Sequence, residues 1–248
     1  MVVRKSNREL ALMREAGRIV AVTHASLEEN VKPGVTTAEL DALAYEVVTK
    51  HGAEPSFLGY RGFPASLCVS INEEVVHGIP GPRVLEEGDI VSLDFGAIYK
   101  GYHGDAAITV GVGKIDQAAQ ELVETTRGAL EAAIGQCRPG NHLGDVSWAI
   151  QDYAESRGYS VVRQYVGHGI GRSMHEDPQI PNYGSPGRGL LLKPGMTFAL
   201  EPMVNMGTYL TEVLDDNWTV ATEDRKLSAH FEHTVAITED GPEILTRL

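Results

Sequence analysis

Cysteine is scarce in this sequence. The chain contains only Cys68 and Cys137, which lie far apart and form no CxxC motif. Neither a disulfide framework nor a zinc site built from thiolates is therefore indicated. Cysteines without a pairing pattern are typical of a reducing compartment, so we predict a cytoplasmic protein.

Long apolar runs are also missing. No stretch approaches the roughly 20 uninterrupted apolar residues of a membrane-spanning helix, and the N-terminal MVVRKSNREL lacks the apolar segment of an export signal. Basic residues are outnumbered, with 21 lysines and arginines against 34 aspartates and glutamates and a formal net charge of -13. We therefore expect neither a membrane nor a nucleic acid as the main partner.

What the sequence does contain is a globular composition with clear signals for helix starts. Its 248 residues are 42% hydrophobic and 22% charged, which favours one folded domain over 1–248. Ser6 with Glu9, and Thr36 with Glu39, form capping-box patterns ahead of apolar residues spaced mostly three or four apart. Helices are predicted over about 6–30, 36–52, 117–134 and 143–157.

The two halves of the chain resemble each other. VKPGVTTAELDALAYEVVTKHG, starting at Val31, is similar to CRPGNHLGDVSWAIQDYAESRG, starting at Cys137, and LEEGDIVSLD at 85–94 is similar to LKPGMTFALE at 192–201. The two shifts are nearly equal, 106 from 31 to 137 and 107 from 85 to 192. We predict an internal duplication of about 1–112 and 113–248. The alternative is that any helix followed by a turn and a strand gives some likeness.

The stretch DFGAIYKGYHGD, from Asp94 to Asp105, predicts a β-hairpin because residue types alternate on both sides of a central turn. A turn at Tyr99 and Lys100 would place the two aspartates directly opposite each other. A turn at Lys100 and Gly101 would make them diagonal neighbours within roughly 8 Å. Both alternatives leave the carboxylates on one face, where like charges repel unless a positive group separates them.

Each half supplies one pair of such acids, Asp94 and Asp105 in the first and Glu201 and Glu232 in the second. A single pair would be compatible with a solvated sheet face. Four carboxylates that converge on a pseudo-twofold axis require protonation, arginine partners or metal ions. No arginine lies obviously nearby in the sequence, so divalent cations are the predicted partners.

The nine histidines fall into groups according to their surroundings. Those on helical stretches are expected to face solvent, whereas those in glycine-rich segments such as VVHGIP and VGHGIGRSMHEDP are expected to face a site. Two more precede a predicted ligand by two positions and could support it from the same strand face. The groups are His24, His51 and His142 in solvent, His77, His168 and His175 at the site, and His103 and His230 as supports, with His233 on the opposite face.

As a set, VVHGIP, SLDFG with HGD, GHGIGRSMHEDP, LKPGMTFALEPMV and FEHTVAIT resemble the type I methionine aminopeptidases, members of the pita-bread metallopeptidases. The resemblance covers nearly the whole chain. It implies an α+β pita-bread fold, in which two halves related by a pseudo-twofold axis place antiparallel β-sheet inside and helices outside.

The resemblance also implies a set of site residues. It predicts two divalent ions, Co, Mn, Fe or Zn, held by Asp94, Asp105, His168, Glu201 and Glu232. Catalytic roles fall to His77, His175 and Glu201. The substrate pocket would contain both of these histidines with Tyr60, Phe63, Cys68, Met174 and Trp218, although ordinary core packing explains the apolar members equally well from the sequence alone.

The function implied by the resemblance is removal of the initiator methionine from nascent polypeptides, with preference for a small second residue. Nascent N-termini are then the partners, transient ribosome contact is compatible with this role, and a monomer is expected. One rival is a proline-specific peptidase of the same fold, whose members usually carry a separate N-terminal domain. The other is a pita-bread binding module without metal ligands, which the five intact ligand positions disfavour.

Overall fold

The computed structural model describes residues 2–248 and contains four long helices that begin where the sequence predicts. The Ser6 hydroxyl accepts a hydrogen bond from the Glu9 backbone N–H, and the Glu9 carboxylate accepts one from Ser6 in return. Thr36 and Glu39 repeat this capping box. The helices are α1 (Asn7–Asn30), α2 (Thr37–Lys50), α3 (Gln117–Gln136) and α4 (Leu143–Glu155).

The strands form one nine-stranded antiparallel sheet and two small three-stranded sheets. The main sheet has the order β1-β4-β5-β14-β9-β7-β8, with β2 also paired to β4 and β15 to β14. The small sheets are β13-β10-β6 and β11-β12-β3. The bounds are β1 (Glu54–Pro55), β2 (Cys68–Ile71), β3 (Glu74–Val76), β4 (Ile90–Tyr99), β5 (Tyr102–Gly111), β6 (Ser160–Val161), β7 (Gly167–Gly169), β8 (Glu176–Ile180), β9 (Thr197–Leu200), β10 (Met203–Asn205), β11 (Thr211–Val213), β12 (Val220–Thr222), β13 (Ser228–His230), β14 (Glu232–Thr238) and β15 (Gly241–Ile244).

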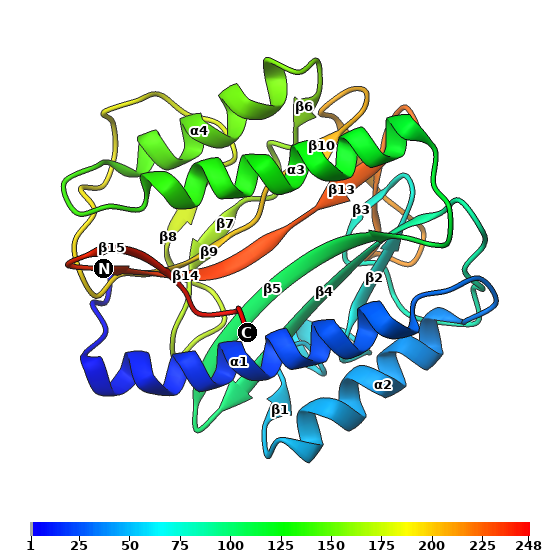
Figure 1. Cartoon of the computed structure of the whole chain (residues 1–248), viewed down its shortest axis with the longest axis horizontal. Coiled ribbons are helices and arrows are strands. Elements are labelled where there is room, and N and C mark those ends of the chain that lie inside the picture. Colours follow the sequence, from blue (N-terminus) through cyan, green and yellow to red (C-terminus); the bar gives the residue numbers. More distant parts are fainter. Residues whose placement is uncertain (1) are drawn as a thin grey trace.

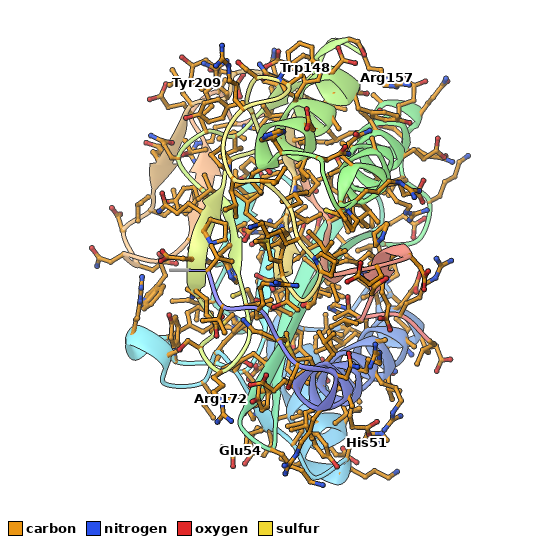
Figure 2. All side chains as sticks on the ribbon, turned by 90° about the vertical axis from the view of Figure 1, so that its left-hand side faces the viewer. His51, Glu54, Trp148, Arg157, Arg172 and Tyr209 are labelled. Carbon is orange, nitrogen blue, oxygen red and sulfur yellow. The ribbon has the colours of Figure 1, made fainter. Side chains whose placement is uncertain are left out.

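The helices are arranged as two pairs at opposite ends of the sheet. Helices α1 and α2 lie at one end and α3 and α4 at the other, with the long strands β4, β5 and β14 between them (Figure 1). Figure 2 shows the same separation, because Trp148 and Arg157 from the α4 region lie far from His51, which follows α2. Each pair has its own apolar core against the sheet. None of the helices within 2–248 is long and apolar enough to cross a membrane.

The two helix pairs share an equivalent structural feature. An isolated β-bridge between Thr36 and Val84 ties the start of α2 to the segment that leads into β4, and one between His142 and Leu191 ties the start of α4 to the segment that leads into β9. The arrangement is the pita-bread architecture with two related halves that the sequence predicts. That these halves, 1–112 and 113–248, form one catalytic domain that arose by duplication remains a proposal.

Helix α1 approaches the sheet unusually closely at two glycines. A Cβ atom on Gly104 in β5 would lie 2.7 Å from the Gly17 backbone nitrogen, and one on Gly17 would lie 2.2 Å from the Leu245 carbonyl oxygen. Any larger side chain would therefore push the helix and the sheet apart. This contact fixes the position of β5, which carries Asp105.

The structure decides between the two predicted hairpin registers. Asp94 is opposite Ala107 and Asp105 is opposite Gly96, so the turn is at Lys100 and Gly101 and the carboxylates are diagonal neighbours. Both turn residues have positive φ, 47° and 78°, which suits the right-handed twist of the flanking strands. The alternative with the aspartates directly opposite is wrong.

The prediction for His24 is also wrong. The His24 side chain lies on the buried face of α1, and burial lowers its pKa to about 3. The reason is helical periodicity: His24 follows Val20 by four positions and precedes Leu27 by three, and both are fully buried. His51 and His142 remain partly exposed, as expected.

Candidate metal centre

Four carboxylates come from four strands that are consecutive neighbours in the main sheet. Asp94 lies in β4, Asp105 in β5 and Glu232 at the start of β14, while Glu201 directly follows β9. Glu232 is opposite Ala107 in β5, so it lies two residues from Asp105 along that strand. The sheet therefore gathers onto its inner face acids that are up to 138 positions apart, from 94 to 232.

His168 in β7 completes the cluster. It is paired with Ala199 in β9, and its Nε2 atom lies 3.5 Å from Glu201 Oε1. One donor atom each from Asp105, His168 and Glu232 lie within 4.8 Å of one another. The His168 Nδ1 atom is 2.9 Å from the Gly169 carbonyl oxygen. That carbonyl can only accept, so Nδ1 carries the proton and Nε2 is free to bind a cation.

Asp105 and Glu232 are buried and Asp94 and Glu201 are half-buried, and none of the four has a basic partner in the described chain that could neutralise it. Asp94 Oδ1, Asp105 Oδ1 and Glu232 Oε1 have no hydrogen bond, and no lysine or arginine within 2–248 forms an ion pair with them. Burial raises the pKa of Asp94 to about 7. Burial, reinforced by the neighbouring carboxylates, raises the pKa values of Asp105, Glu201 and Glu232 well above their usual range.

This donor set fits divalent cations. Oxygen-rich clusters with one imidazole suit Mn, Fe, Co or Zn, and four neighbouring carboxylates without basic partners can stay ionised together only when cations neutralise them. Burial lowers the pKa of His168 to about 3, so its imidazole is neutral at pH 7, the form that binds metal.

The residues that support the carboxylates differ from those predicted. The Thr234 hydroxyl accepts from the Asp105 N–H at 2.9 Å and donates to the Asp105 carbonyl at 2.8 Å. The Asn182 side chain donates to the Glu201 carbonyl oxygen at 3.1 Å. Thr234 could have been found, since it follows Glu232 by two on the same strand face, whereas Asn182 carries no local signal.

The histidines predicted as supports make other contacts. His103 Nδ1 lies 2.9 Å from the Ser56 hydroxyl, and His230 Nε2 is buried without a hydrogen-bond partner. Neither forms a hydrogen bond to a carboxylate in the described chain. His233 lies on the opposite face, where its Nδ1 is 2.8 Å from the Thr246 hydroxyl, as expected.

A cavity of about 150 Å³ opens onto the cluster. Every residue that the sequence predicted for metal binding, catalysis or the substrate pocket lines it, and the structure adds two that were not predicted, Phe57 and Arg61. The predicted lining residues are Tyr60, Phe63, Cys68, His77, Asp94, Asp105, His168, Met174, His175, Glu201, Trp218 and Glu232.

One end of this cavity is apolar. Phe57, Phe63, Cys68 and Met174 belong to one small hydrophobic cluster, and the ring of Trp218 packs edge-on against Phe63 with centroids 5.1 Å apart. Cys68 is directly opposite Asp94 across β2 and β4, so the apolar end touches the carboxylates. Burial raises the pKa of the Cys68 thiol, which therefore stays protonated and acts as a small apolar group.

Two histidines face the space between the apolar end and the carboxylates. His175 is stacked on Tyr60, whose hydroxyl oxygen lies 2.9 Å from His175 Nδ1, and its ring centroid is 4.1 Å from that of His168. His77 has a positive φ of 62° and packs edge-on against Trp218. Burial lowers the pKa of His77 to about 4 and that of His175 below its usual value, so both rings are neutral at pH 7.

The sequence pattern of metallopeptidase family M24 matches residues 11–239. The chain belongs to metallopeptidase family M24. Among curated M24 relatives, methionine aminopeptidase 1 of Bacillus subtilis is 56% identical over 248 residues and covers 100% of both chains. Methionine aminopeptidase of Clostridium perfringens is 54% identical over 246 residues and covers 99% of both.

Solved structures of M24 proteins agree with this assignment. The crystal structure of methionine aminopeptidase from Thermotoga maritima matches with a TM-score of 0.99 at 50% identity and covers 100% of both chains. Prolidase from Pyrococcus furiosus matches with a TM-score of 0.79 at 24% identity, and the match covers 66% of that chain. The similarity to the prolidase shows a shared fold alone.

Proposed function

We propose that this chain is a metal-dependent methionine aminopeptidase that removes the N-terminal methionine of nascent polypeptides and prefers a small second residue. The observation that carries the proposal is the cavity in which an apolar, sulfur-containing end adjoins a buried carboxylate and histidine cluster. Full-length relatives at 54–56% identity carry the same name.

In this proposal, Asp94, Asp105, His168, Glu201 and Glu232 hold two divalent ions, of Co, Mn, Fe or Zn. When bound, such ions would polarise the scissile carbonyl and acidify the attacking water. The support for these assignments is the convergence of five donors that have no protein cation to neutralise them.

The cavity explains why the enzyme would act only at a chain end. The metal centre held by the five donor residues would offer a ligand position to the free α-amine of the substrate, while the adjoining apolar end accepts the first side chain. With both groups seated, the first peptide bond lies beside the two histidines. An internal peptide bond has no free amine to offer and loses this interaction.

The protein's own residues would then move the proton and stabilise charge. Glu201 directly follows β9 beside His168 and would take a proton from the attacking water and return it to the departing amine. When the Tyr60 hydroxyl donates to His175 Nδ1, the remaining proton lies on Nε2 and can be donated to the carbonyl oxygen. His77 would donate to the same peptide from the other side.

Selectivity for methionine follows from the lining of the apolar end. Met174 and Cys68 offer polarisable sulfur beside the aromatic rings of Phe63 and Trp218, which suits a long unbranched thioether. A side chain branched at Cβ or Cγ would need more width. We further propose a monomer that acts in the cytoplasm on emerging chains, with at most transient contact to the ribosome.

Peptide hydrolysis tests this function directly. We expect Met-Ala-Ser to be cleaved with kcat/KM at least about 10-fold above that of Leu-Ala-Ser, because one pocket discriminates similar apolar side chains by roughly 10- to 200-fold. A chelator should abolish both activities, and added Mn²⁺ or Co²⁺ should restore them. Preferential cleavage of Ala-Pro over Met-Ala-Ser would contradict the proposal and favour the proline-specific alternative.

A further inference from the structure

Arg61 is the only lysine or arginine among residues 2–248 that lines the cavity. The other charged lining residues are the four carboxylates of the metal centre. Arg61 belongs to the short turn Tyr60–Gly62 and is exposed to solvent. No hydrogen bond or ion pair engages its guanidinium group within the described chain, so its positive charge is available to a ligand.

The backbone holds this arginine in an unfavourable conformation. Arg61 has φ 51° and ψ 20°, the left-handed region that residues with a side chain seldom adopt. Gly59 and Gly62 on either side also have positive φ, 79° and 90°, and the Gly59 N–H donates to the Phe63 carbonyl at 2.9 Å. Such strain persists where surrounding contacts enforce it, and it is often found at ligand-binding sites.

The turn places Arg61 next to the catalytic histidine. Its Cζ atom lies 5.4 Å from the centroid of the Tyr60 ring, and the same ring is stacked on His175. The positive charge of Arg61 is close enough to contribute, after burial, to the lowered pKa of His175. Tyr60 therefore lies between the guanidinium and the place where the scissile carbonyl is expected.

We infer that Arg61 binds a carboxylate of the substrate beyond the scissile bond, which rests on the proposed aminopeptidase function. The first side chain occupies the apolar end and the α-amine lies at the metal centre, so the rest of the substrate must leave past His175 towards the exposed rim. Arg61 lies on that rim. It can bind an acidic side chain at the third or a later residue, or the terminal carboxylate of a tripeptide.

The negative charge of the rest of the chain makes the contact with Arg61 selective for acidic substrates. The chain has a formal net charge of -13, so the average field repels an acidic peptide and attracts a basic one. A single unpaired arginine at the mouth of the cavity reverses this preference locally. The enzyme therefore favours substrates with an acid near the third residue over those with a base there.

A cycle of enzyme and substrate variants tests this inference. The substrates are C-terminally amidated pentapeptides, Met-Ala-Xaa-Gly-Ser, with Asp, Asn or Lys at Xaa. For the wild-type enzyme we expect kcat/KM for the Asp peptide to exceed that for the Lys peptide by about three- to tenfold, mainly through KM, as for partly exposed ion pairs. A salt concentration of about 0.5 M should weaken the preference.

The enzyme variants separate a local contact from a change in total charge. Arg61→Asn keeps a residue that tolerates the left-handed backbone and should remove the preference, whereas Arg61→Lys should retain part of it. Arg188→Asn removes one exposed arginine outside the cavity and should leave the preference intact. Comparing Met-Ala-Ser as free acid and as amide distinguishes the terminal carboxylate from an acidic side chain.

The outcomes distinguish this inference from the function on which it rests. An Asp to Lys ratio in Arg61→Asn equal to that of the wild type, with the neutral Asn peptide cleaved by both, would overturn the role of Arg61 alone. Failure of the metal-loaded wild type to cleave even the Asn peptide would overturn the aminopeptidase function, and the role of Arg61 with it.

Discussion

Replacing His175 by alanine is expected to lower kcat for Met-Ala-Ser by about 10² to 10⁴-fold while KM changes little. The magnitude is typical of removing a proton donor that acts mainly in the transition state. The ring of His175 is fixed by its hydrogen bond to Tyr60 and by stacking on the Tyr60 ring, and its lowered pKa keeps it neutral. It is therefore a preorganised hydrogen-bond donor. Steady-state kinetics with the metal-loaded protein measure the effect.

His51→Ala is the matched control for this variant. His51 is partly exposed, follows α2 and does not line the cavity, so its removal should leave kcat unchanged (Figure 2). Thermal unfolding of both variants checks that the fold is retained. A His175→Ala enzyme that keeps kcat within threefold of the wild type would remove this residue from the mechanism.

Removing the metal is expected to make the stability of the protein fall as the pH rises from about 7 to 8.5. The pKa of Asp94 is raised to about 7, and those of Asp105, Glu201 and Glu232 are raised well above their usual range. In the unfolded chain these groups lose their protons near pH 4. The folded metal-free protein therefore retains protons that the unfolded chain has released, and stability is lost as these protons leave.

The chosen pH window excludes the contribution of the histidines. The buried histidines, such as His168 with a pKa of about 3 and His77 with one of about 4, have lowered pKa values. Their contribution to stability is lost only as the pH falls below about 6.5, because they are neutral in both states above it. Between pH 7 and 8.5 the histidines therefore contribute little, and the comparison with metal-loaded protein separates the carboxylates from the buried thiols of Cys68 and Cys137, whose pKa values are also raised.

Urea unfolding at the two pH values measures this effect. Each proton retained by the folded form is worth about 1.4 kcal/mol per pH unit, so we expect the metal-free protein to lose about 2 kcal/mol across the window for each carboxyl that stays protonated. Protein saturated with Mn²⁺ should lose much less, since the cations replace the protons. Equal pH dependence with and without metal would contradict the electrostatic account of the cluster.

Much of the fold was readable in the sequence because its signals are local. Capping boxes at Ser6 and Thr36 gave the starts of α1 and α2, and the period-two alternation around Asp94 and Asp105 placed both on one face. Both signals depend on residues a few positions apart. The family motifs then predicted residues that the structure brings to one cavity, from segments far apart in the chain.

Some of the features that the sequence missed depend on tertiary packing. The hairpin register was left open because it depends on the positive φ of Lys100. A lysine gives no sequence signal for that conformation. Two misses did carry a local signal, because His24 lies between Val20 and Leu27 on the buried face of α1 and Thr234 follows Glu232 by two on one strand face. Asn182 is defined only by its bond to a distant backbone atom. Arg61 was missed because neither its type nor its spacing marks it.

Uptake of divalent ions by metal-free protein, followed by titration calorimetry at pH 7, tests the central claim most directly. The account predicts two ions per chain, with protons released from the buried carboxyls and detected as a dependence of the heat on the buffer's ionisation enthalpy. His168→Ala should weaken or abolish the uptake at one site. If the wild-type protein takes up no Mn²⁺ or Co²⁺, or binds them without releasing protons, the buried acidic cluster is not a metal centre.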